Sequence, residues 1–292
     1  MPQQPKVTIV VPTHNRMGPM LEAVRSLLNQ DYGNFEILIV DNNSSDGTAQ
    51  QVARLAADEP RVRYVYESRP GLTKARERGG KDALGELVAY VDDDEIAPPD
   101  WLSKLVRLQQ ATGAAGVGGP YEPLWLAPPP SWLLNSSAMC ETLTFMDFGP
   151  DRTRVDWLLG GNALYTRQAL EATGYYGGYG FGAGRMRLVG GEDILMGRRM
   201  RAAGYELWYE PTAVVGHQVP PERMRIGYIL RRAFWAGYTD VAIGQQWNLS
   251  DKSAKALRRG WDAVALGLAI LPGTLYGRLH VATGVLVPAT AK

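Results

Sequence analysis

The stretch 87-LVAYVDDDEIAPPDWL-102 indicates the fold of this chain, because its residues predict a buried strand, a polar turn and the start of a helix in succession. Residues 87–91 are apolar with high β propensity, which predicts a strand that is buried on both faces. Pro98 and Pro99 end the extended segment, since proline has no backbone N–H. Apolar residues then recur at helical spacing between 101 and 108, so we expect a helix that packs on the sheet.

Four consecutive acids stand where that strand ends: Asp92, Asp93, Asp94 and Glu95. Carboxylates packed this closely repel one another, so each raises the pKa of its neighbours unless a cation is present. Divalent ions such as Mg²⁺ and Mn²⁺ prefer carboxylate oxygens and readily share phosphate oxygens. Open α/β sheets bind ligands at the carboxyl ends of their strands. The alternative is a solvated acidic turn that caps the next helix, but the buried strand favours a metal site.

The composition excludes several classes of protein. A chain of 292 residues that is 45% hydrophobic can bury a core as one large domain or two closely joined ones. Its 31 basic and 30 acidic residues leave a net charge of +1, which argues against a nucleic-acid partner. The single Cys140 excludes an internal disulfide and fits a reducing compartment, so we expect a cytoplasmic protein. No signal peptide and no run of 18 uncharged apolar residues is visible, so we expect no ordinary membrane span.

Strands and helices alternate with short links in the first part of the chain. The expected strands lie within 6–12, 35–41, 62–66 and 87–91, and the expected helices within 17–30, 49–57 and 72–84. This alternation predicts an α/β fold in which a mainly parallel sheet is covered on both faces.

The regular pattern breaks at residues 121–155. This segment contains several prolines, including 128-PPP-130, and aromatic residues that we expect to be exposed at Trp125, Trp132 and Phe145. We interpret it as a long, mobile loop region, and loops of such length are usually functional.

From residue 156 onward the sequence again predicts regular helices and strands. Gly160 and Gly161 would let the backbone pass close to a ligand. A helix is expected within 190–204, with Glu192 and Asp193 in its first turn. Taken alone, these two acids would be ordinary first-turn residues. Two short strands are expected after the helix, at 206–210 and 213–217.

The tail from residue 221 has a different composition. Residues 222–259 contain eight basic residues and three acids, interleaved with Phe234, Trp235 and other aromatics. This excess of basic and aromatic side chains would suit an anionic membrane surface, and we expect peripheral contact there. Residues 263–287 are strongly apolar but interrupted by polar residues and a proline. Two interpretations of that segment stay open: an interfacial segment, or helices packed on the domain.

Five motifs resemble, in order, those of the inverting GT-A glycosyltransferases of family two: VTIVVPTHNR, ILIVDNNSSDGT, GELVAYVDDDEIAPPDWL, LLGGNALYTRQAL and GGEDILMGRRMRAAG. Each alone is weak, but five in the family's order across residues 6–217 are a strong signal. The resemblance implies a GT-A, Rossmann-like sheet, mostly parallel and flanked by helices. It also implies a nucleotide-sugar-binding section at 1–120, an acceptor-binding and catalytic section at 121–218, and a helical, basic C-terminal extension at 219–292.

The resemblance implies a divalent ion, Mn²⁺ or Mg²⁺, held by a D-x-D motif. It makes Asp92 and Asp94 ligands, with Asp94 the more direct one, and adds His217. Neutral imidazole can ligate a metal, although a lone histidine is more often structural. Asp193 is the family's general base, and Glu192 assists at the acceptor hydroxyl. Because a helix N-terminus favours an anion, we expect Asp193 to be ionised at neutral pH.

The same resemblance implies a nucleotide pocket formed by Pro12, Thr13, Asn15, Arg16, Asp41, Asp46, Arg69, Arg76, Asp92 and Asp93. Asp41 would hydrogen-bond the base, most typically uracil, and Asp46 would close the far side. Asn and Asp also cap helices and tolerate tight turns, so turn chemistry is an alternative role that can hold together with the first. Arg76 has a second interpretation as a solvated helix residue. The family's asparagine after this arginine is Glu77 here, which departs from the pattern.

Two further contacts follow from the resemblance. Gly161 and Asn162 resemble the turn that faces the sugar, which with Glu192 would bind the sugar or the acceptor. Arg223 is a candidate clamp for the diphosphate.

The expected activity is transfer of a single sugar. Processive relatives carry Q-x-x-R-W, and the nearest match here, 231-RRAFW-235, lacks the glutamine. We expect a nucleotide diphosphate sugar as donor, UDP first and GDP second, and a hydroxyl of a glycan or lipid-linked acceptor. One alternative is a nucleotidyltransferase, which normally has a glycine-rich loop after its first strand, whereas 12-PTHNR-16 has no glycine. The other is a non-catalytic nucleotide- or sugar-binding module, which would not need an acid at 193.

Overall fold

The computed structural model describes residues 4–143, 147–177, 190–243, 271–276 and 278. The chain divides into two compact units. The first comprises Met1–Glu122, Asp147–Ala183 and Glu192–His217, and the second comprises Pro123–Met146, Gly184–Gly191 and Gln218–Lys292. The functional division at residues 120 and 218 stays a prediction.

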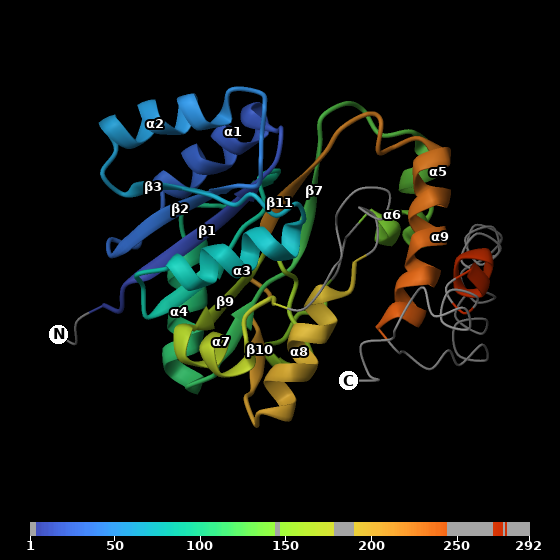
Figure 1. Ribbon diagram of the computed structural model, residues 1–292. Helices are drawn as coiled ribbons and strands as arrows, with labels where there is room; N and C mark the ends of the chain where they lie inside the picture. The colour runs from blue at the N-terminus through green and yellow to red at the C-terminus, as the bar shows by residue number, and fades with distance from the viewer. Residues whose placement is uncertain (1–3, 144–146, 178–189, 244–270, 277, 279–292) are drawn as a thin grey trace. The chain divides into compact units, whose positions relative to one another are not determined.

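The first unit is built on an eight-stranded sheet (Figure 1). From edge to edge its strands are β3 (Val62–Tyr66), β2 (Phe35–Asp41), β1 (Val7–Thr13), β4 (Leu87–Tyr90), β9 (Ala163–Thr166), β6 (Gly116–Gly118), β10 (Leu207–Tyr209) and β8 (Thr153–Val155). Strands β1 to β4 run parallel, whereas β9 is antiparallel to both of its neighbours. The α/β class with a mostly parallel sheet is therefore confirmed.

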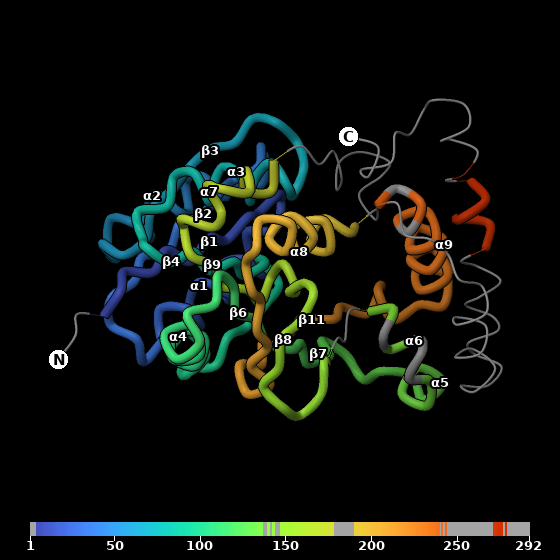
Figure 2. Tube along the Cα trace, turned by 90° about the horizontal axis from the view of Figure 1, so that it is seen from below, coloured from blue at the N-terminus to red at the C-terminus, as the bar shows by residue number. Residues whose placement is uncertain are grey.

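Helices cover both faces of this sheet, and the sheet lies between the two layers in Figures 1 and 2. One layer is α1 (Met17–Leu28), α2 (Thr48–Asp58) and α4 (Trp101–Thr112), and the other is α3 (Leu72–Asp82), α7 (Arg167–Thr173) and α8 (Glu192–Ala202). Successive strand residues point to opposite faces. Ile9 therefore packs in the core under α1, while Val10 packs in the core under α3.

A second, three-stranded sheet brings a distant strand to the acidic turn. Its order is β5 (Glu95–Ile96), β11 (Val215–Val219) and β7 (Tyr121–Trp125). Strands β5 and β11 pair antiparallel, and His217 lies opposite Glu95 in the register. This pairing carries a histidine from 122 residues later in the chain to the end of β4.

The expected long loop at 121–155 is wrong. The segment contains β7, β8 and two short helices, α5 (Ser131–Leu134) and α6 (Ser137–Thr142). Leu133 and Met139 pack with Met224 and Ile229, so this segment forms a core with α9 (Ile226–Ala242). The proline run precedes α5 rather than keeping the whole segment irregular. Trp132 is 40% exposed as expected, Trp125 is half-buried against that core, and Phe145 lies outside the described residues.

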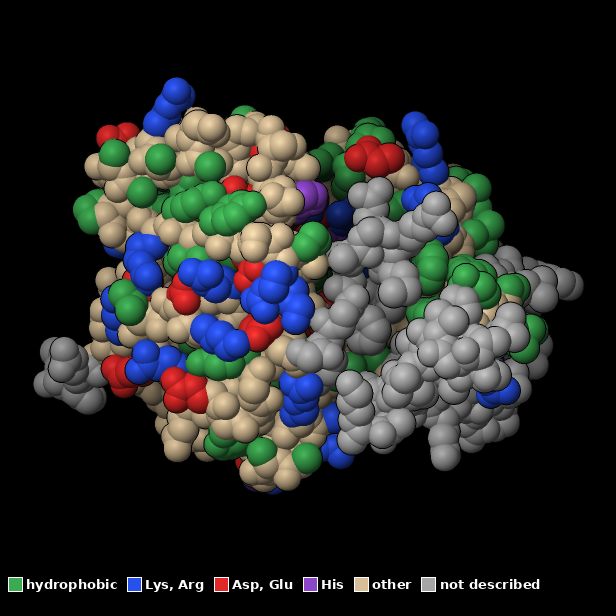
Figure 3. All heavy atoms as spheres, in the orientation of Figure 1, with side chains coloured by type: hydrophobic (Ala, Val, Ile, Leu, Met, Phe, Trp, Pro, Cys, Tyr) green, Lys and Arg blue, Asp and Glu red, His purple; other side chains and the backbone are tan. Residues whose placement is uncertain are grey.

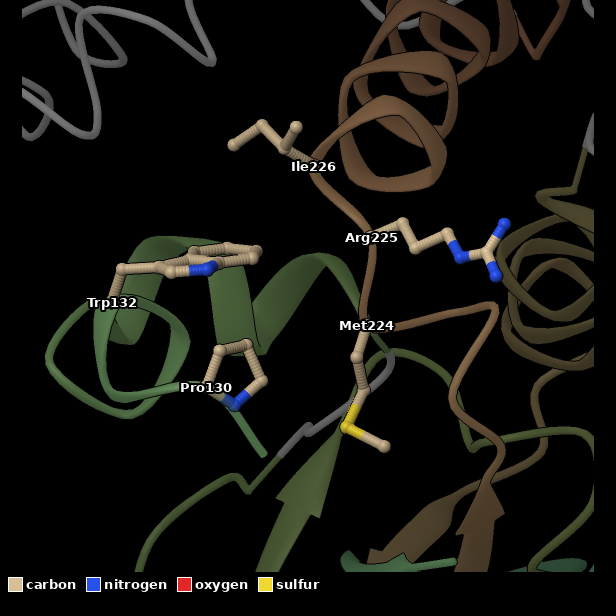
Figure 4. A pocket seen from close by; sticks show the side chains of 5 residues that line it. All are labelled: Pro130, Trp132, Met224, Arg225 and Ile226. Atoms are coloured by element: carbon tan, nitrogen blue, oxygen red, sulfur yellow. The ribbon is translucent and has the colours of Figure 1, made fainter. Parts of the chain in front are cut away.

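The second unit has a shallow surface pocket of about 590 Å³ (Figure 4). Its lining residues are Pro130, Trp132, Met224, Arg225 and Ile226. Figure 4 shows the Arg225 guanidinium pointing away from Trp132, so the pocket presents mainly apolar groups.

Much of the tail falls outside the described residues, including Trp247, four of the basic residues counted above and most of 263–287. Within the described part, α9 carries 231-RRAFW-235. No helix among the described residues combines the length and the apolar character that a bilayer crossing requires.

Candidate functional site

The acidic turn after β4 is tied to the end of β1. The side chains of Asp93 and Asp94 are 6% and 5% exposed. Arg16 bridges them, with Nη1 2.6 Å from Asp93 Oδ1 and Nη2 2.8 Å from Asp94 Oδ2. The Thr13 hydroxyl donates to Asp93 Oδ2 at 2.8 Å. Burial raises the pKa of Asp93 to about 7, although the Arg16 charge opposes the shift.

Arg76 joins the acidic turn to the start of α8. Its side chain is only 2% exposed. Nη2 lies 2.8 and 3.0 Å from the two carboxylate oxygens of Asp92, while Nη1 lies 3.3 Å from Glu192 Oε1 and 3.2 Å from Asp193 Oδ1. The interpretation of Arg76 as a solvated helix residue is therefore wrong. One guanidinium therefore contacts both Asp92, a predicted metal ligand, and Asp193, the predicted general base.

Asp193 is held by the backbone as well as by Arg76. The N–H of Gly160 donates to Asp193 Oδ2 at 3.0 Å. A side chain at position 160 would overlap Asp193 Oδ1 and the Arg76 guanidinium, so only glycine allows this approach. The glycine thus brings the backbone close to the candidate base.

The expectation that Asp193 is fully ionised at neutral pH needs correction. Burial and then the Glu192 charge raise the pKa of Asp193 to about 7, against the lowering effects of Arg76 and the Gly160 N–H. Burial outweighs the helix N-terminus because the dipole of one helix contributes less than the loss of most of a carboxylate's hydration.

Glu95, which is buried, and Tyr121, which is partly buried, form a polar layer beneath the site that no motif predicted. The backbone N–H of Asp92 donates to Glu95 Oε2 at 2.8 Å, and the Gly161 N–H donates to the Tyr121 hydroxyl at 2.9 Å. Burial and then the Asp92 charge raise the pKa of Glu95 well above its ordinary value. A side chain at 161 would overlap the Glu95 carboxyl group. Glu95 was visible as a fourth acid, but no sequence signal pointed to Tyr121.

His217 reaches the acidic turn through the pairing of β11 with β5. Its Nε2 lies 3.3 Å from Asp94 Oδ2, and its ring packs on Tyr121 with centroids 5.9 Å apart. An imidazole nitrogen beside a carboxylate oxygen suits Mn²⁺ or Mg²⁺. Asp92, the third predicted ligand, pairs with Arg76 instead. Across the part of the chain that the structure describes, no three Asp, Glu, His or Cys side chains are gathered as a complete metal-binding group.

The residues predicted to bind the base of the nucleotide lie at the carboxyl ends of β1 and β2. Asp41 is buried, and its carboxylate accepts from the Tyr64 hydroxyl at 2.9 Å and from the Ser44 N–H at 2.8 Å. Asp46 accepts from the Met17 N–H at 3.0 Å, which ties the start of α1 to the turn before α2. These hydrogen bonds stabilise the turns, which is one of the two roles expected for Asp41 and Asp46; the other is contact with the nucleotide.

Three other members of the predicted pocket occupy the neighbouring turns. Pro12 is the sixth residue of β1 and is buried. Asn15 has a φ of 51°, and its side-chain oxygen accepts from the Ser45 N–H at 2.7 Å. Arg69 is half-exposed and pairs with Glu67 at 2.7 Å. Nucleotide contacts by these residues stay predictions.

Gly161 and Asn162 are predicted to form the turn that faces the sugar, and that role of the turn stays a prediction. Asn162 is fully buried, its Oδ1 accepts from Trp101 Nε1 at 2.8 Å, and its Nδ2 donates to the carbonyls of Pro120 and Ala213 at 2.9 and 2.8 Å. The amide therefore cross-links three segments under the site. Arg223 belongs to the second unit, and its contact with a diphosphate stays a prediction.

Comparisons with known proteins agree on one family. The model of the family described as Glycosyl transferase family 2 matches residues 8–172. The succinoglycan biosynthesis protein ExoM of Rhizobium meliloti (strain 1021) is 27% identical over 256 residues, which cover 86% of this chain and 78% of that protein. The glucosyl-dolichyl phosphate glucuronosyltransferase of Haloferax volcanii is 27% identical over 241 residues, which cover 80% of this chain and 76% of that protein.

A solved structure shares the fold. The mannosyltransferase PcManGT from Pyrobaculum calidifontis, in complex with GDP-Man and Mn²⁺, superposes with a TM-score of 0.59 and 23% identity. The match covers 99% of this chain and 79% of that one. At this level of identity the likeness establishes the GT-A fold.

Proposed function

The chain belongs to glycosyl transferase family 2, and from that premise we propose that it transfers one sugar from a nucleotide diphosphate sugar to a hydroxyl, with inversion. A nucleotidyltransferase and a non-catalytic module, the two alternatives, are both set aside by this membership. We take UDP as the first choice of nucleotide and GDP as the second.

The observation that carries the proposal is the pairing of Arg76 with Asp92 on one side and Asp193 on the other. The predicted metal-binding turn and the predicted base thus meet at one buried cation, although 100 residues of chain separate them. An arrangement of this kind would bring a leaving group and a general base into one site, as a single displacement requires.

In the proposed reaction the acceptor hydroxyl oxygen attacks the anomeric carbon. The bond from that carbon to the diphosphate oxygen breaks, and its electron pair leaves with the nucleoside diphosphate. The hydroxyl proton passes to the Asp193 carboxylate. A base with a pKa of about 7 suits this step, because it is ionised often enough to act and basic enough to take the proton. Attack from the face opposite the leaving group inverts the anomeric configuration.

Asp94 and His217, whose side chains approach to 3.3 Å, would hold Mn²⁺ or Mg²⁺. Asp92 would join them after a change in its pairing with Arg76. A bound divalent ion would stabilise the negative charge that develops on the diphosphate. Arg16, Asp41 and the turn residues around them would bind the nucleotide, consistent with their place at the ends of β1 and β2.

For the acceptor we propose a glycan or a lipid-linked sugar of the cell envelope. The relatives support this class: one is named for succinoglycan biosynthesis, and the other for glucosyl-dolichyl phosphate. Acceptors with and without a polyprenyl or dolichyl chain, offered in parallel, would separate the two types.

We also propose peripheral contact between the second unit and an anionic membrane surface. That unit exposes large apolar side chains, with Leu126 at 55%, Trp132 at 40% and Ile226 at 49%. Co-sedimentation with anionic vesicles should exceed that with neutral vesicles and fall at high salt. Equal binding to both vesicle types, or none to either, would end this part of the proposal.

Replacing Asp193 with Asn tests the proposed chemistry. Amide and carboxylate have nearly the same shape, so donor binding should persist while transfer falls about 10²- to 10⁴-fold. The measurements are Mn²⁺-dependent release of UDP or GDP from a panel of nucleotide sugars, and donor affinity by calorimetry. NMR of the product should show the anomeric configuration opposite to that of the donor. Full activity in the variant, or retention of configuration, would refute the proposal.

A further inference from the structure

Arg16 is placed to do more than contact a nucleotide. Its two terminal nitrogens bond to different carboxylates, at 2.6 Å to Asp93 and 2.8 Å to Asp94. A guanidinium that bridges two acids in this way acts as their counter-ion, since its planar fork matches carboxylate oxygens.

The bridge uses the oxygen that a metal would need. Asp94 Oδ2 accepts from Arg16 Nη2 and also lies 3.3 Å from His217 Nε2. A divalent ion held by Asp94 and His217 would therefore lie close to the guanidinium. Two cations next to one carboxylate oxygen repel each other strongly in a partly buried site.

Arg16 is also more exposed than Asp93, Asp94 and His217. Its side chain is 35% exposed, whereas those of Asp93 and Asp94 are 6% and 5% exposed. It precedes the first turn of α1 and makes no side-chain capping bond there. The guanidinium can therefore swing into solvent, or onto a bound anion, without opening the core of the first unit.

We propose that Arg16 is a built-in counter-ion that competes with the divalent metal for Asp94 and transfers to the donor diphosphate when the nucleotide binds. The inference rests on the proposed function, because it assumes a metal-bound nucleotide. It adds that metal and nucleotide bind cooperatively, and that Arg16 is a positioning residue that couples them.

The charges explain the expected cooperativity. With Arg16 in place, Asp93 and Asp94 retain at most one uncompensated negative charge, which is a weak attraction for a free divalent ion. A diphosphate brings further negative charge, accepts the guanidinium and leaves Asp94 for the metal. Each ligand thus removes an obstacle to the other, and linkage requires the effect to be reciprocal.

The test is a comparison of the whole protein with its Arg16→Gln variant, using Mn²⁺ alone, UDP alone and the two together. Glutamine removes the charge and the fork. We expect Mn²⁺ alone to bind about tenfold more tightly to the variant, and UDP in the presence of Mn²⁺ to bind about tenfold more weakly, so that the coupling shrinks in both directions. Calorimetry for UDP and electron paramagnetic resonance for free Mn²⁺ give these constants without any activity assay.

Three further variants keep the outcome interpretable. Arg61→Gln breaks an exposed pair with Glu59 in the same unit, and it should leave both affinities unchanged. Arg16→Lys keeps one charge but cannot bridge two acids in the same way, so it should fall between the wild type and Arg16→Gln. Adding His217→Ala to Arg16→Gln should abolish the gain in Mn²⁺ affinity.

Mn²⁺ affinity that stays equal or falls in a folded Arg16→Gln variant would overturn the inference, because Arg16 would then support the site rather than compete at it. If the wild type binds no Mn²⁺ even with UDP or GDP present, the proposed metal dependence fails first, and the inference fails with it. The two failures are therefore separable.

Discussion

Two arginines hold the acids of this site, and they do so in opposite ways. Arg76 is 2% exposed and contacts Asp92, Glu192 and Asp193, whereas Arg16 is 35% exposed and contacts Asp93 and Asp94. The first lies in the middle of α3 and the second in the turn before α1. Burial holds Arg76 between its partners, whereas partial exposure to solvent allows Arg16 to change its partners.

Ion pairs of one type can therefore serve two purposes within one site. A buried charge must stay paired, because leaving its partners alone in a low-dielectric interior is costly. An exposed charge can exchange partners, because water solvates it during the exchange. We therefore propose that Arg76 keeps its carboxylate partners when ligands bind, whereas Arg16 exchanges a carboxylate partner for the bound diphosphate.

The largest effect is expected from Arg76→Met. The substitution leaves Asp92, Glu192 and Asp193 without their shared cation, so we expect a loss of about 3 to 5 kcal/mol in the free energy of unfolding. Urea denaturation followed by circular dichroism measures the loss. A loss below about 1 kcal/mol would mean that Arg76 does not hold the site together.

The pH dependence of transfer should show the state of Asp193. Only the ionised carboxylate can take the acceptor's proton, and a pKa of about 7 means that it becomes protonated as the pH falls. At saturating donor we expect transfer to fall by roughly 50-fold between pH 7 and pH 5. In Glu192→Gln, which removes a neighbouring charge that raises this pKa, the midpoint should move to lower pH. A profile that is flat over this range in the wild type would contradict the assignment of the base.

The smallest effect is expected at Arg78, two residues from Arg76 on the same helix. Arg78 is 42% exposed and pairs with Asp82 at 2.7 Å. Figure 3 shows basic side chains interleaved with acidic ones over the region that α3 occupies in Figure 1. Arg78→Gln should therefore cost no more than about 0.5 kcal/mol of stability and leave transfer unchanged. A loss as large as that of Arg76→Met would show that burial is not what distinguishes the two residues.

The fold of the first unit could be predicted because its signals are local. Apolar runs marked the parallel strands, and the alternation of strands with helices indicated a sheet covered on both faces, as the two cores show. The 121–155 segment was misjudged because its apolar residues pack against α9, a partner that no local pattern indicates.

The site was predictable where acids gather in sequence, and unpredictable where contacts are made across the fold. The acidic turn and the Glu192–Asp193 pair were visible, but their link through Arg76 spans more than 100 residues. The structural role of the Asn162 side chain was not predictable, because its three long-range hydrogen bonds cannot be seen in the sequence. The ionisation of Asp193 depends on its burial, which the helix position alone does not reveal.

The most direct test of the proposed site is a crystal structure of the protein with UDP and Mn²⁺. We predict that Mn²⁺ is bound by Asp94 and His217, that Arg16 contacts the diphosphate, and that Asp193 faces the space in front of the diphosphate while still bonded to Arg76 and Gly160. Mn²⁺ and UDP bound away from the acidic turn, or a closed space in front of Asp193 that no acceptor hydroxyl can enter, would contradict it.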